Sequence, residues 1–316
     1  MKSVSISHLF FFIAFSASSL VHAAPFAYVS NEKSGTMSII DTANDEVVAE
    51  MKAGAKPRGA AVSKDGKFLF VSDQPANAIQ VVDLQTRLVV KQIELGESPE
   101  GVGISPDGKW VVVASEIKNS ISFVNTVSQK IEFSVKVNGK NPEHAEFSPD
   151  SKWVYVGAED GEQVDVINVA KRKQTGQVMV GKRPRGIGFI PDGTRAYVAA
   201  ELADTVYAID THSLKVIAEI KAGSFSNGVV VTSDGSKVYV SNGKDGTVSC
   251  IDTKQNVVIA TIPVGKRPWN MALTPDNKKL YVANGRSNSV SVIDTETNQK
   301  IRDVEVGETP WGVVIK

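Results

Sequence analysis

A short apolar segment that ends in aspartate or asparagine recurs seven times along this chain. Its copies end at Asp41, Asp83, Asn125, Asn168, Asp210, Asp252 and Asp294, so that neighbouring copies are 42 or 43 residues apart. A second segment, YVSN in the copy ending at Asn31, and a G-x-x-P motif, such as Gly54 to Pro57, recur in the same phase. Three markers in one phase indicate an architecture of stacked units, in which each unit buries its faces against its neighbours.

Each repeat contains four short segments rich in valine and isoleucine, which in one copy read GVGIS, WVVVAS, SISFVN and KIEFSV. These segments show no helical period, and tight-turn sequences such as Pro106-Asp107-Gly108 separate them. Four strands in about 42 residues are typical of a propeller blade. The sequence therefore predicts an all-β fold for residues 25–316, a seven-bladed β-propeller of four-stranded antiparallel blades.

The two ends of the repeat region are each incomplete. AYVSN at the start is a second strand without a first, and WGVVIK at the end is a first strand without a successor. We therefore expect the N-terminal strands to pair with residues 312–315, which closes the ring and leaves no exposed terminal blade.

Residues 1–24 have the composition of a secretory signal peptide. Lys2 provides a basic start, residues 9–15 (LFFFIAF) form a short apolar run, and Val21-His22-Ala23 fits the small-residue pattern before a cleavage site. We expect cleavage near Ala23 and Ala24 and export of the remaining chain. The apolar run is shorter than a permanent membrane span requires.

Composition excludes several chemistries. Lys+Arg and Asp+Glu are both 35, so no basic field favours nucleic acid. The single cysteine, Cys250, cannot form an internal disulfide or a cysteine-based metal site; it occupies an apolar repeat position, which predicts a buried thiol. The sequence contains no C-x-x-C-H, G-x-S-x-G, H-E-x-x-H or phosphate-loop motif. The repeated Asp41-type residues are interpreted as turn caps, and the tyrosines of the YVSN-type segments as core between blades.

The repeats resemble the YVTN family of β-propeller repeats, at YVSN in residues 28–31 and 239–242, at YVAN in 281–284 and at SVIDTET in 291–297. Over residues 26–316 the chain is similar to the pyrroloquinoline-quinone (PQQ)-dependent catabolism-associated β-propeller family, whose length, leader, seven repeats and ending, Thr309-Pro310-Trp311-Gly312, it shares. This resemblance implies a periplasmic protein encoded with quinoprotein alcohol oxidation and a transport system. The resemblance implies a quinoprotein dehydrogenase or a transporter component as partner. It does not imply a defined biochemical activity.

Departures from the repeat indicate a candidate site. In a propeller, the loops between blades open onto one end of the central channel, and the loops after the second strands open onto the same end. The residues after the G-x-x-P motif are therefore expected to converge there: Arg58, Glu100, Glu143, Arg185, Asn227, Trp269 and Trp311. His144 and Asn270 replace a glycine at the next position, and Glu146 brings a further charge nearby. After the second strands, Glu32, Glu116, Glu159 and Glu201 add carboxylates.

Three functions are compatible with these residues. The first is a non-enzymatic accessory protein, expected to be a monomer without a cofactor, which binds a small ligand or partner protein at the channel mouth. The arginines suit anionic groups, and the tryptophans suit an aromatic or alcohol-derived ligand. The alternative is a metal-assisted lactonase or lyase, with calcium or magnesium held by Glu100, Glu143, His144 and Asn227. The third, an adhesion module using the outer rim, lacks an apolar patch in the turn loops. Each loop residue also has a structural interpretation, because glutamates and arginines pair with one another and tryptophans plug channels.

Overall fold

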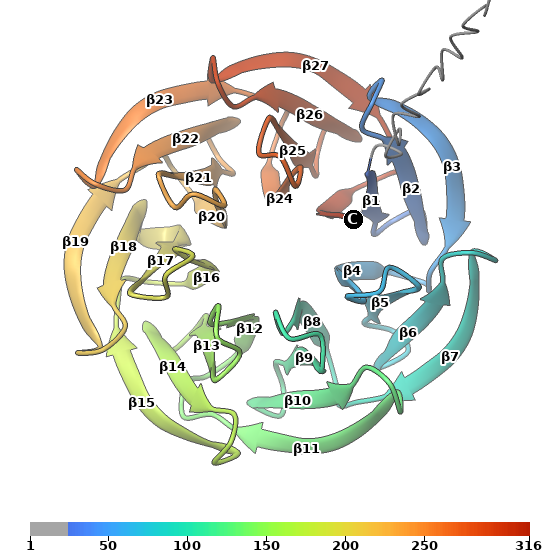
Figure 1. Ribbon diagram of the computed structural model, residues 1–316, viewed down its shortest axis with the longest axis horizontal. Coiled ribbons are helices and arrows are strands. Elements are labelled where there is room, and N and C mark those ends of the chain that lie inside the picture. The colour runs from blue at the N-terminus through green and yellow to red at the C-terminus, as the bar shows by residue number, and fades with distance from the viewer. Residues whose placement is uncertain (1–24) are drawn as a thin grey trace, which may run out of the picture.

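The computed structural model describes residues 25–316, so the predicted leader and its cleavage point lie outside the described residues. Seven four-stranded antiparallel sheets are arranged in a ring around one axis, which confirms the predicted seven-bladed propeller (Figure 1). Among the described residues the helical structure is a single 3₁₀ turn, η1 (Glu201–Ala203).

Each blade runs from an innermost to an outermost strand, and we number the blades in chain order. Blade 1 contains β28 (Pro310–Ile315), β1 (Phe26–Asn31), β2 (Thr36–Asp41) and β3 (Glu46–Lys52). Blade 2 contains β4 (Pro57–Val62), β5 (Phe68–Asp73), β6 (Ala78–Asp83) and β7 (Leu88–Glu94). Blade 3 contains β8 (Pro99–Ile104), β9 (Trp110–Ser115), β10 (Ser120–Asn125) and β11 (Lys130–Lys136). Blade 4 contains β12 (Pro142–Phe147), β13 (Trp153–Ala158), β14 (Gln163–Asn168) and β15 (Lys173–Met179).

The remaining three blades follow the same order. Blade 5 contains β16 (Pro184–Phe189), β17 (Arg195–Ala200), β18 (Thr205–Asp210) and β19 (Lys215–Lys221). Blade 6 contains β20 (Ser226–Val231), β21 (Lys237–Asn242), β22 (Thr247–Asp252) and β23 (Val257–Pro263). Blade 7 contains β24 (Pro268–Leu273), β25 (Lys279–Asn284), β26 (Ser289–Asp294) and β27 (Gln299–Glu305).

Blade 1 closes the ring with strands from both ends of the repeat region. Strand β28 pairs antiparallel with β1, with Tyr28 opposite Val314 and Val29 opposite Val313. The backbones of Phe26 and Lys316 exchange two hydrogen bonds, of 2.9 and 3.0 Å. The predicted pairing with residues 312–315 is confirmed, and every blade thereby has a neighbour on both faces.

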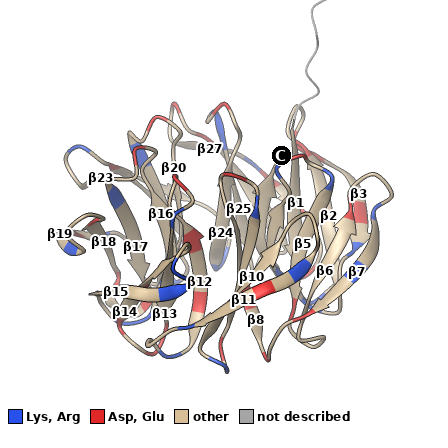
Figure 2. Cartoon of the chain, turned by 60° about the horizontal axis from the view of Figure 1, so that its bottom comes forward, with Lys and Arg blue, Asp and Glu red and all other residues tan. Residues whose placement is uncertain are grey.

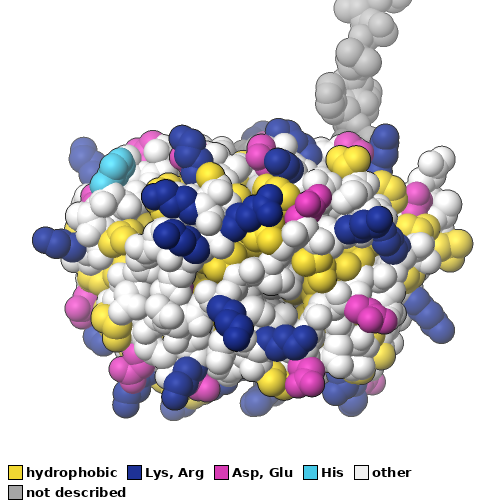
Figure 3. Space-filling model, turned by 90° about the horizontal axis from the view of Figure 1, so that it is seen from below, with side chains coloured by type: hydrophobic (Ala, Val, Ile, Leu, Met, Phe, Trp, Pro, Cys, Tyr) yellow, Lys and Arg dark blue, Asp and Glu magenta, His cyan; other side chains and the backbone are white. Residues whose placement is uncertain are grey.

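The hydrophobic core lies between blades, because each sheet buries both faces. One cluster joins Val29 and Ile40 of blade 1 to Tyr281 and Val290 of blade 7. In the outermost strands side chains reach solvent, and hydrophobic, basic and acidic groups are interspersed over the part of the rim seen in Figure 3. In the part of the chain that the structure describes, no helix has the length and hydropathy of a membrane span.

The repeated aspartates cap the turn that follows them, as predicted. Asp294 Oδ1 accepts a hydrogen bond of 2.7 Å from the Thr297 backbone, and Asn125 Oδ1 accepts one of 3.0 Å from Val127. The hydrogen bond from Thr297 lowers the pKa of Asp294. Since such a cap recurs in every blade, these residues belong to the scaffold rather than to a site.

Cys250 lies in β22 with none of its surface exposed, and burial raises the pKa of its thiol. Because the thiolate is the reactive form, we expect native protein to react with a thiol reagent such as DTNB only on unfolding. Colour release in buffer and in denaturant measures this, with one thiol per chain appearing in denaturant. Prompt, complete reaction in buffer would contradict the buried placement.

Candidate functional site

One end of the ring carries a cavity of about 300 Å³ where the loops between blades meet the loops after the second strands. All seven residues that follow the G-x-x-P motif, or its equivalent in blade 6, line it. The complete lining is Glu32, Arg58, Gln74, Glu100, Glu116, Glu143, Glu159, Arg183, Arg185, Asn227, Arg267, Trp269, Asn270 and Trp311. We call this cavity the mouth.

The innermost strands are close enough to bring these side chains together. A Cβ atom at Gly101 would lie 2.5 Å from the carbonyl oxygen of Glu143 on the next blade, and one at Gly228 would lie 2.5 Å from that of Trp269. Real side chains do not tolerate such contacts, so these positions require glycine for the close approach of backbone. Strand β12 departs, with His144 in place of the glycine, and it is the innermost strand that carries two acidic residues, Glu143 and Glu146 (Figure 2).

Arg185 is the centre of a network of ion pairs in the mouth. Its Nη2 lies 2.8 Å from Glu159 Oε1, its Nε lies 2.9 Å from Glu201 Oε2, and its Nη1 contacts Glu143 Oε1. Arg267 Nη2 contacts Glu201 Oε1 at 2.6 Å. The three glutamate side chains are at most 8% exposed, so the guanidinium groups neutralise carboxylates that water does not reach.

A second group of charged side chains comes from blades 1, 2 and 3. Arg58 contacts Glu100 Oε1 and lies 3.0 Å from Glu32 Oε1. Glu100 is 1% exposed and its Oε2 has no hydrogen-bond partner, and burial raises its pKa to about 7. Glu100 is thus a carboxylate whose ionised form is incompletely stabilised.

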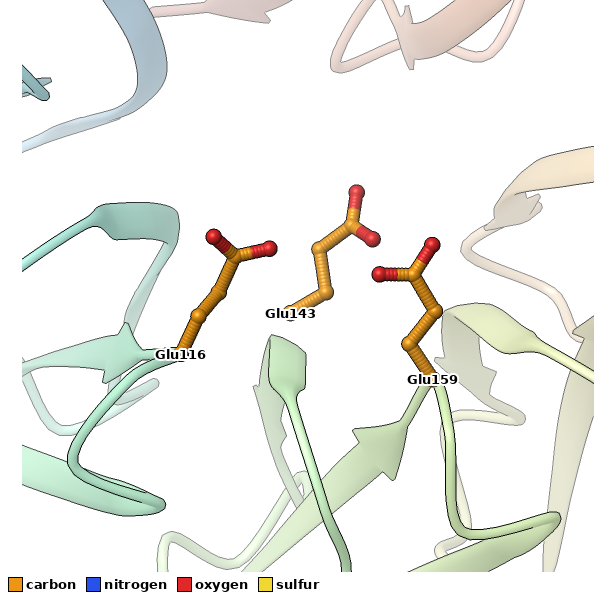
Figure 4. A group of neighbouring side chains, drawn as sticks. All are labelled: Glu116, Glu143 and Glu159. Carbon is orange, nitrogen blue, oxygen red and sulfur yellow. The ribbon is translucent and has the colours of Figure 1, made fainter.

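Glu116, Glu143 and Glu159 direct their carboxylates toward one another (Figure 4). One oxygen from each lies within 4.8 Å of the others, a spacing at which they could ligate one cation. Glu143 is 7% exposed, and its Oε2 has no hydrogen-bond partner. Six carboxylates (Glu32, Glu100, Glu116, Glu143, Glu159 and Glu201) face four guanidinium groups (Arg58, Arg183, Arg185 and Arg267), so the formal excess is two negative charges when all six carboxylates are ionised.

The structure places His144 differently from the other predicted residues. It lines the channel beneath the mouth rather than the mouth itself, and its Nε2 lies 3.7 Å from Glu146 Oε2. Of the predicted metal set, Glu143 alone belongs to the carboxylate group that the structure brings together. Glu100 is engaged by Arg58 and Gln74 instead, and Asn227 lines the mouth without joining that group.

The sequence analysis missed Arg183 and Arg267. Both directly precede the proline of their G-x-x-P motif, and both have a left-handed backbone, with φ of 62° and 56°. An arginine at this repeated position in two copies is the signal that could have identified them. Gly285 also has a role in the mouth, because a Cβ there would lie 2.4 Å from the Trp269 ring.

The raised pKa of Glu100 predicts a pH dependence of stability. Between pH 4.5 and about 7 the folded chain retains a proton that the unfolded chain has lost, so the free energy of unfolding falls as pH rises through this range. The loss is about 3 kcal/mol. We expect the free energy of unfolding of Glu100→Gln to lack this pH-dependent loss. Urea titrations of both proteins at pH 4.5, 6 and 8 measure the free energy of unfolding. Parallel pH profiles for the two proteins would refute the assignment.

The fold and mouth define a closed seven-bladed propeller with a charged cavity at one end. A family model described as "Lactonase, 7-bladed beta-propeller" matches residues 91–179 and 170–308. These stretches together cover more than half of the 316 residues, and the chain belongs to this family of propellers. A second model, described as a YNCE-like beta-propeller, matches residues 16–104. No curated protein matches the chain.

Two similar solved structures support the same fold. A structure titled as hydrazine synthase of Kuenenia stuttgartiensis has a TM-score of 0.79 at 23% identity, and the match covers 90% of this chain and 99% of that chain. A functionally unknown protein from Desulfotomaculum acetoxidans has a TM-score of 0.82 at 18% identity, with 92% and 99% covered. At these identities the likeness shows the fold alone.

Proposed function

We propose that this protein binds a small oxygen-bearing ligand in the mouth, together with a divalent cation held by Glu116, Glu143 and Glu159. The observation that carries the proposal is Glu143 Oε2, a buried carboxylate oxygen without a partner. It belongs to a group whose oxygens lie within 4.8 Å of one another, in a mouth with two excess negative charges. Calcium and magnesium bind such oxygens, and one divalent ion would balance the charge.

The groups around the carboxylates suit a ligand of modest size. Trp269 and Trp311 offer flat apolar surfaces, and Asn227 and Asn270 offer amide donors and acceptors. A ligand carbonyl or hydroxyl oxygen could complete the coordination of the cation while an apolar part lies on a tryptophan. A cavity of about 300 Å³ accommodates a compact molecule.

Calorimetry with calcium and magnesium, on protein first dialysed against chelator, tests the cation site. We expect Glu143→Gln to weaken binding at least about tenfold, because it removes a charged ligand worth more than 1.4 kcal/mol. Glu32→Gln is the matched control, since Glu32 lines the same mouth but contacts Arg58 rather than the carboxylate group. Equal affinity of the Glu143 variant and the unaltered protein would refute the site.

A second candidate function is metal-assisted hydrolysis of lactones, which the match to the lactonase family model favours. A cation in the mouth would polarise the lactone carbonyl, and a neighbouring carboxylate would accept a proton from the attacking water. A panel of lactones assayed with and without chelator separates the two functions. Turnover that stops with chelator and in Glu143→Gln supports hydrolysis, whereas ligand binding without turnover supports the non-enzymatic function.

We further propose that the mature protein is periplasmic and acts as a monomer beside a quinoprotein dehydrogenase or its transport system. The leader-like residues 1–24 and the resemblance of the repeats to the PQQ-associated family support this. The intact mass of protein from a periplasmic extract, with a start near Ala24, tests export. Co-purification with a quinoprotein tests the partnership.

A further inference from the structure

Neighbouring blades at one part of the ring are joined by a repeated polar contact. In blade 6, Tyr239 donates a hydrogen bond of 2.9 Å to Asn298 of blade 7, and Lys237 donates one of 2.7 Å to the Thr295 carbonyl. The pair Arg195 and Tyr197 makes the equivalent contact with blade 6, and the pair Lys279 and Tyr281 makes it with blade 1. We call this arrangement of a basic residue, a tyrosine and a turn residue of the next blade the inter-blade lock.

Blade 4 keeps the tyrosine of the lock but lacks its other parts. Trp153 stands at the position of Lys237, and Leu214 of blade 5 stands at the position of Asn298. Tyr155 is 2% exposed, and because the Leu214 side chain has no acceptor, the Tyr155 hydroxyl cannot make the hydrogen bond that Tyr239 makes to Asn298. Blade 4 therefore retains the tyrosine of the lock without the side chain that accepts its hydrogen bond in blade 6.

The missing parts leave a cavity of about 650 Å³ between blades 4 and 5. It lies at the end of the ring opposite the mouth, because its rim consists of turns between first and second strands and the turn between the third and fourth strands of blade 5. Tyr155 and Phe189 form an edge-to-face pair inside it, with ring centroids 4.8 Å apart, and Trp153 is 36% exposed at its rim. This volume is within the range of small-molecule sites.

Comparison with blade 3 shows why the space is open. There the corresponding tryptophan, Trp110, packs against Phe133 of the outermost strand with centroids 5.5 Å apart, and it is 8% exposed. Phe133 is paired with Phe123, and the equivalent pair in blade 4 is Val166 and Gly176. Blade 4 thus has the tryptophan without the aromatic side chain that covers it.

We propose that this cavity binds a neutral aromatic molecule that carries a hydrogen-bond acceptor. The ring of the ligand lies among Trp153, Tyr155 and Phe189. The Tyr155 hydroxyl donates a hydrogen bond to the acceptor of the ligand, which takes the place of the missing asparagine. Aromatic rings in such a pocket gain both apolar burial and edge-to-face contacts. An anionic ligand is disfavoured, because two carboxylates, Asp150 and Asp192, line the rim beside a single imidazole, His212.

The protonation states of the groups that line the cavity agree with this choice. Burial raises the pKa of Tyr155, so the hydroxyl remains a donor at neutral pH. Hydrogen bonds from Thr194 lower the pKa of Asp192, so that carboxylate is charged there. Neither Trp153 nor Leu214 takes part in the mouth, so the two sites can be altered separately.

Binding of 2-naphthol, measured by calorimetry on the full mature chain, tests the proposal, with 2-naphthoate as the anionic analogue. We expect 2-naphthol to bind, 2-naphthoate to bind at least tenfold more weakly, and Tyr155→Phe to weaken 2-naphthol binding by about the same factor. The variant that combines Trp153→Lys with Leu214→Asn rebuilds the lock of blade 6. We expect it to melt at or above the temperature of the unaltered protein and to lose 2-naphthol binding.

The proposal would be overturned by no binding of 2-naphthol to the unaltered protein, by unchanged binding to the folded lock-restoring variant or to Tyr155→Phe, or by equal binding of 2-naphthoate. Glu143→Gln is the control for the mouth. Loss of 2-naphthol binding in this variant would place the ligand in the mouth and also overturn the proposal. Retention of 2-naphthol binding by Glu143→Gln, together with loss of 2-naphthol binding by the lock-restoring variant, supports the proposal.

Discussion

Deletion of residues 310–316 is expected to abolish cooperative folding. The deletion removes β28, which exposes the edge of β1 and uncovers the faces of blades 7 and 2. Val313 is 5% exposed in the intact ring and belongs to the cluster shared with blade 7. Each buried aliphatic side chain contributes about 1.5–3 kcal/mol. A domain with about 5–15 kcal/mol of total stability does not survive the loss of a whole strand and two blade contacts.

Far-UV circular dichroism and a thermal melt of the truncated protein measure this effect. A circular permutant is the matched control: a short glycine linker joins Lys316 to Phe26, and new ends are placed in the exposed turn between Gln85 and Thr86. Since Phe26 and Lys316 already exchange backbone hydrogen bonds, we expect the permutant to fold and melt cooperatively. A truncated protein that melts like the intact chain would show that closure is dispensable.

Replacement of Arg185 by alanine is expected to cost about 3–5 kcal/mol of unfolding free energy. This side chain contacts Glu143, Glu159 and Glu201, whose carboxylates are at most 8% exposed. Its removal takes from Glu143 the ion pair found here and leaves Glu159 and Glu201 to Arg183 and Arg267. A buried carboxylate that loses its partner destabilises the fold more than a site that never held the charged pair.

Urea titration at pH 7 measures the loss, and Lys67→Ala is the control, because Lys67 forms a solvent-exposed pair with Asp65. We expect the control to change stability by less than about 1 kcal/mol. We also expect added calcium to recover part of the stability lost in Arg185→Ala, since a cation in the mouth could neutralise the same carboxylates. An Arg185→Ala protein as stable as the Lys67 control would show that the ion pairs contribute nothing net.

The fold was predictable because its determinants are local and repeated. The capped turn after Asp294, the tight turn at residues 106–108 and the short segments rich in valine and isoleucine each depend on a few neighbouring residues. Seven copies in one phase left one simple way to bury every face, a closed ring. The pairing of β1 with β28 followed from counting strands, without any knowledge of three-dimensional contacts.

The position of the candidate site was predictable from the sequence, but the contacts between its charged side chains were not. Repeat phase identified Arg58, Glu143 and Trp311 as neighbours of the channel mouth, because equivalent positions in a ring are equivalent in space. It did not show that Arg185 engages three glutamates from different segments of the chain, or that the clustered carboxylates are Glu116, Glu143 and Glu159. It also placed His144 at the mouth, whereas the side chain lies in the channel near Glu146.

The sequence alone therefore determined the number of blades, their strands and the end of the ring where the loops gather, since these depend on spacing along the chain. Tertiary structure decided which carboxylates face one another, which polar atoms remain without partners, and where Trp153 leaves a cavity between two blades. Those features depend on side-chain directions and on contacts between residues of neighbouring blades. Repeat spacing aligns equivalent backbone positions, but the side chains that differ between copies determine which charges and which spaces meet.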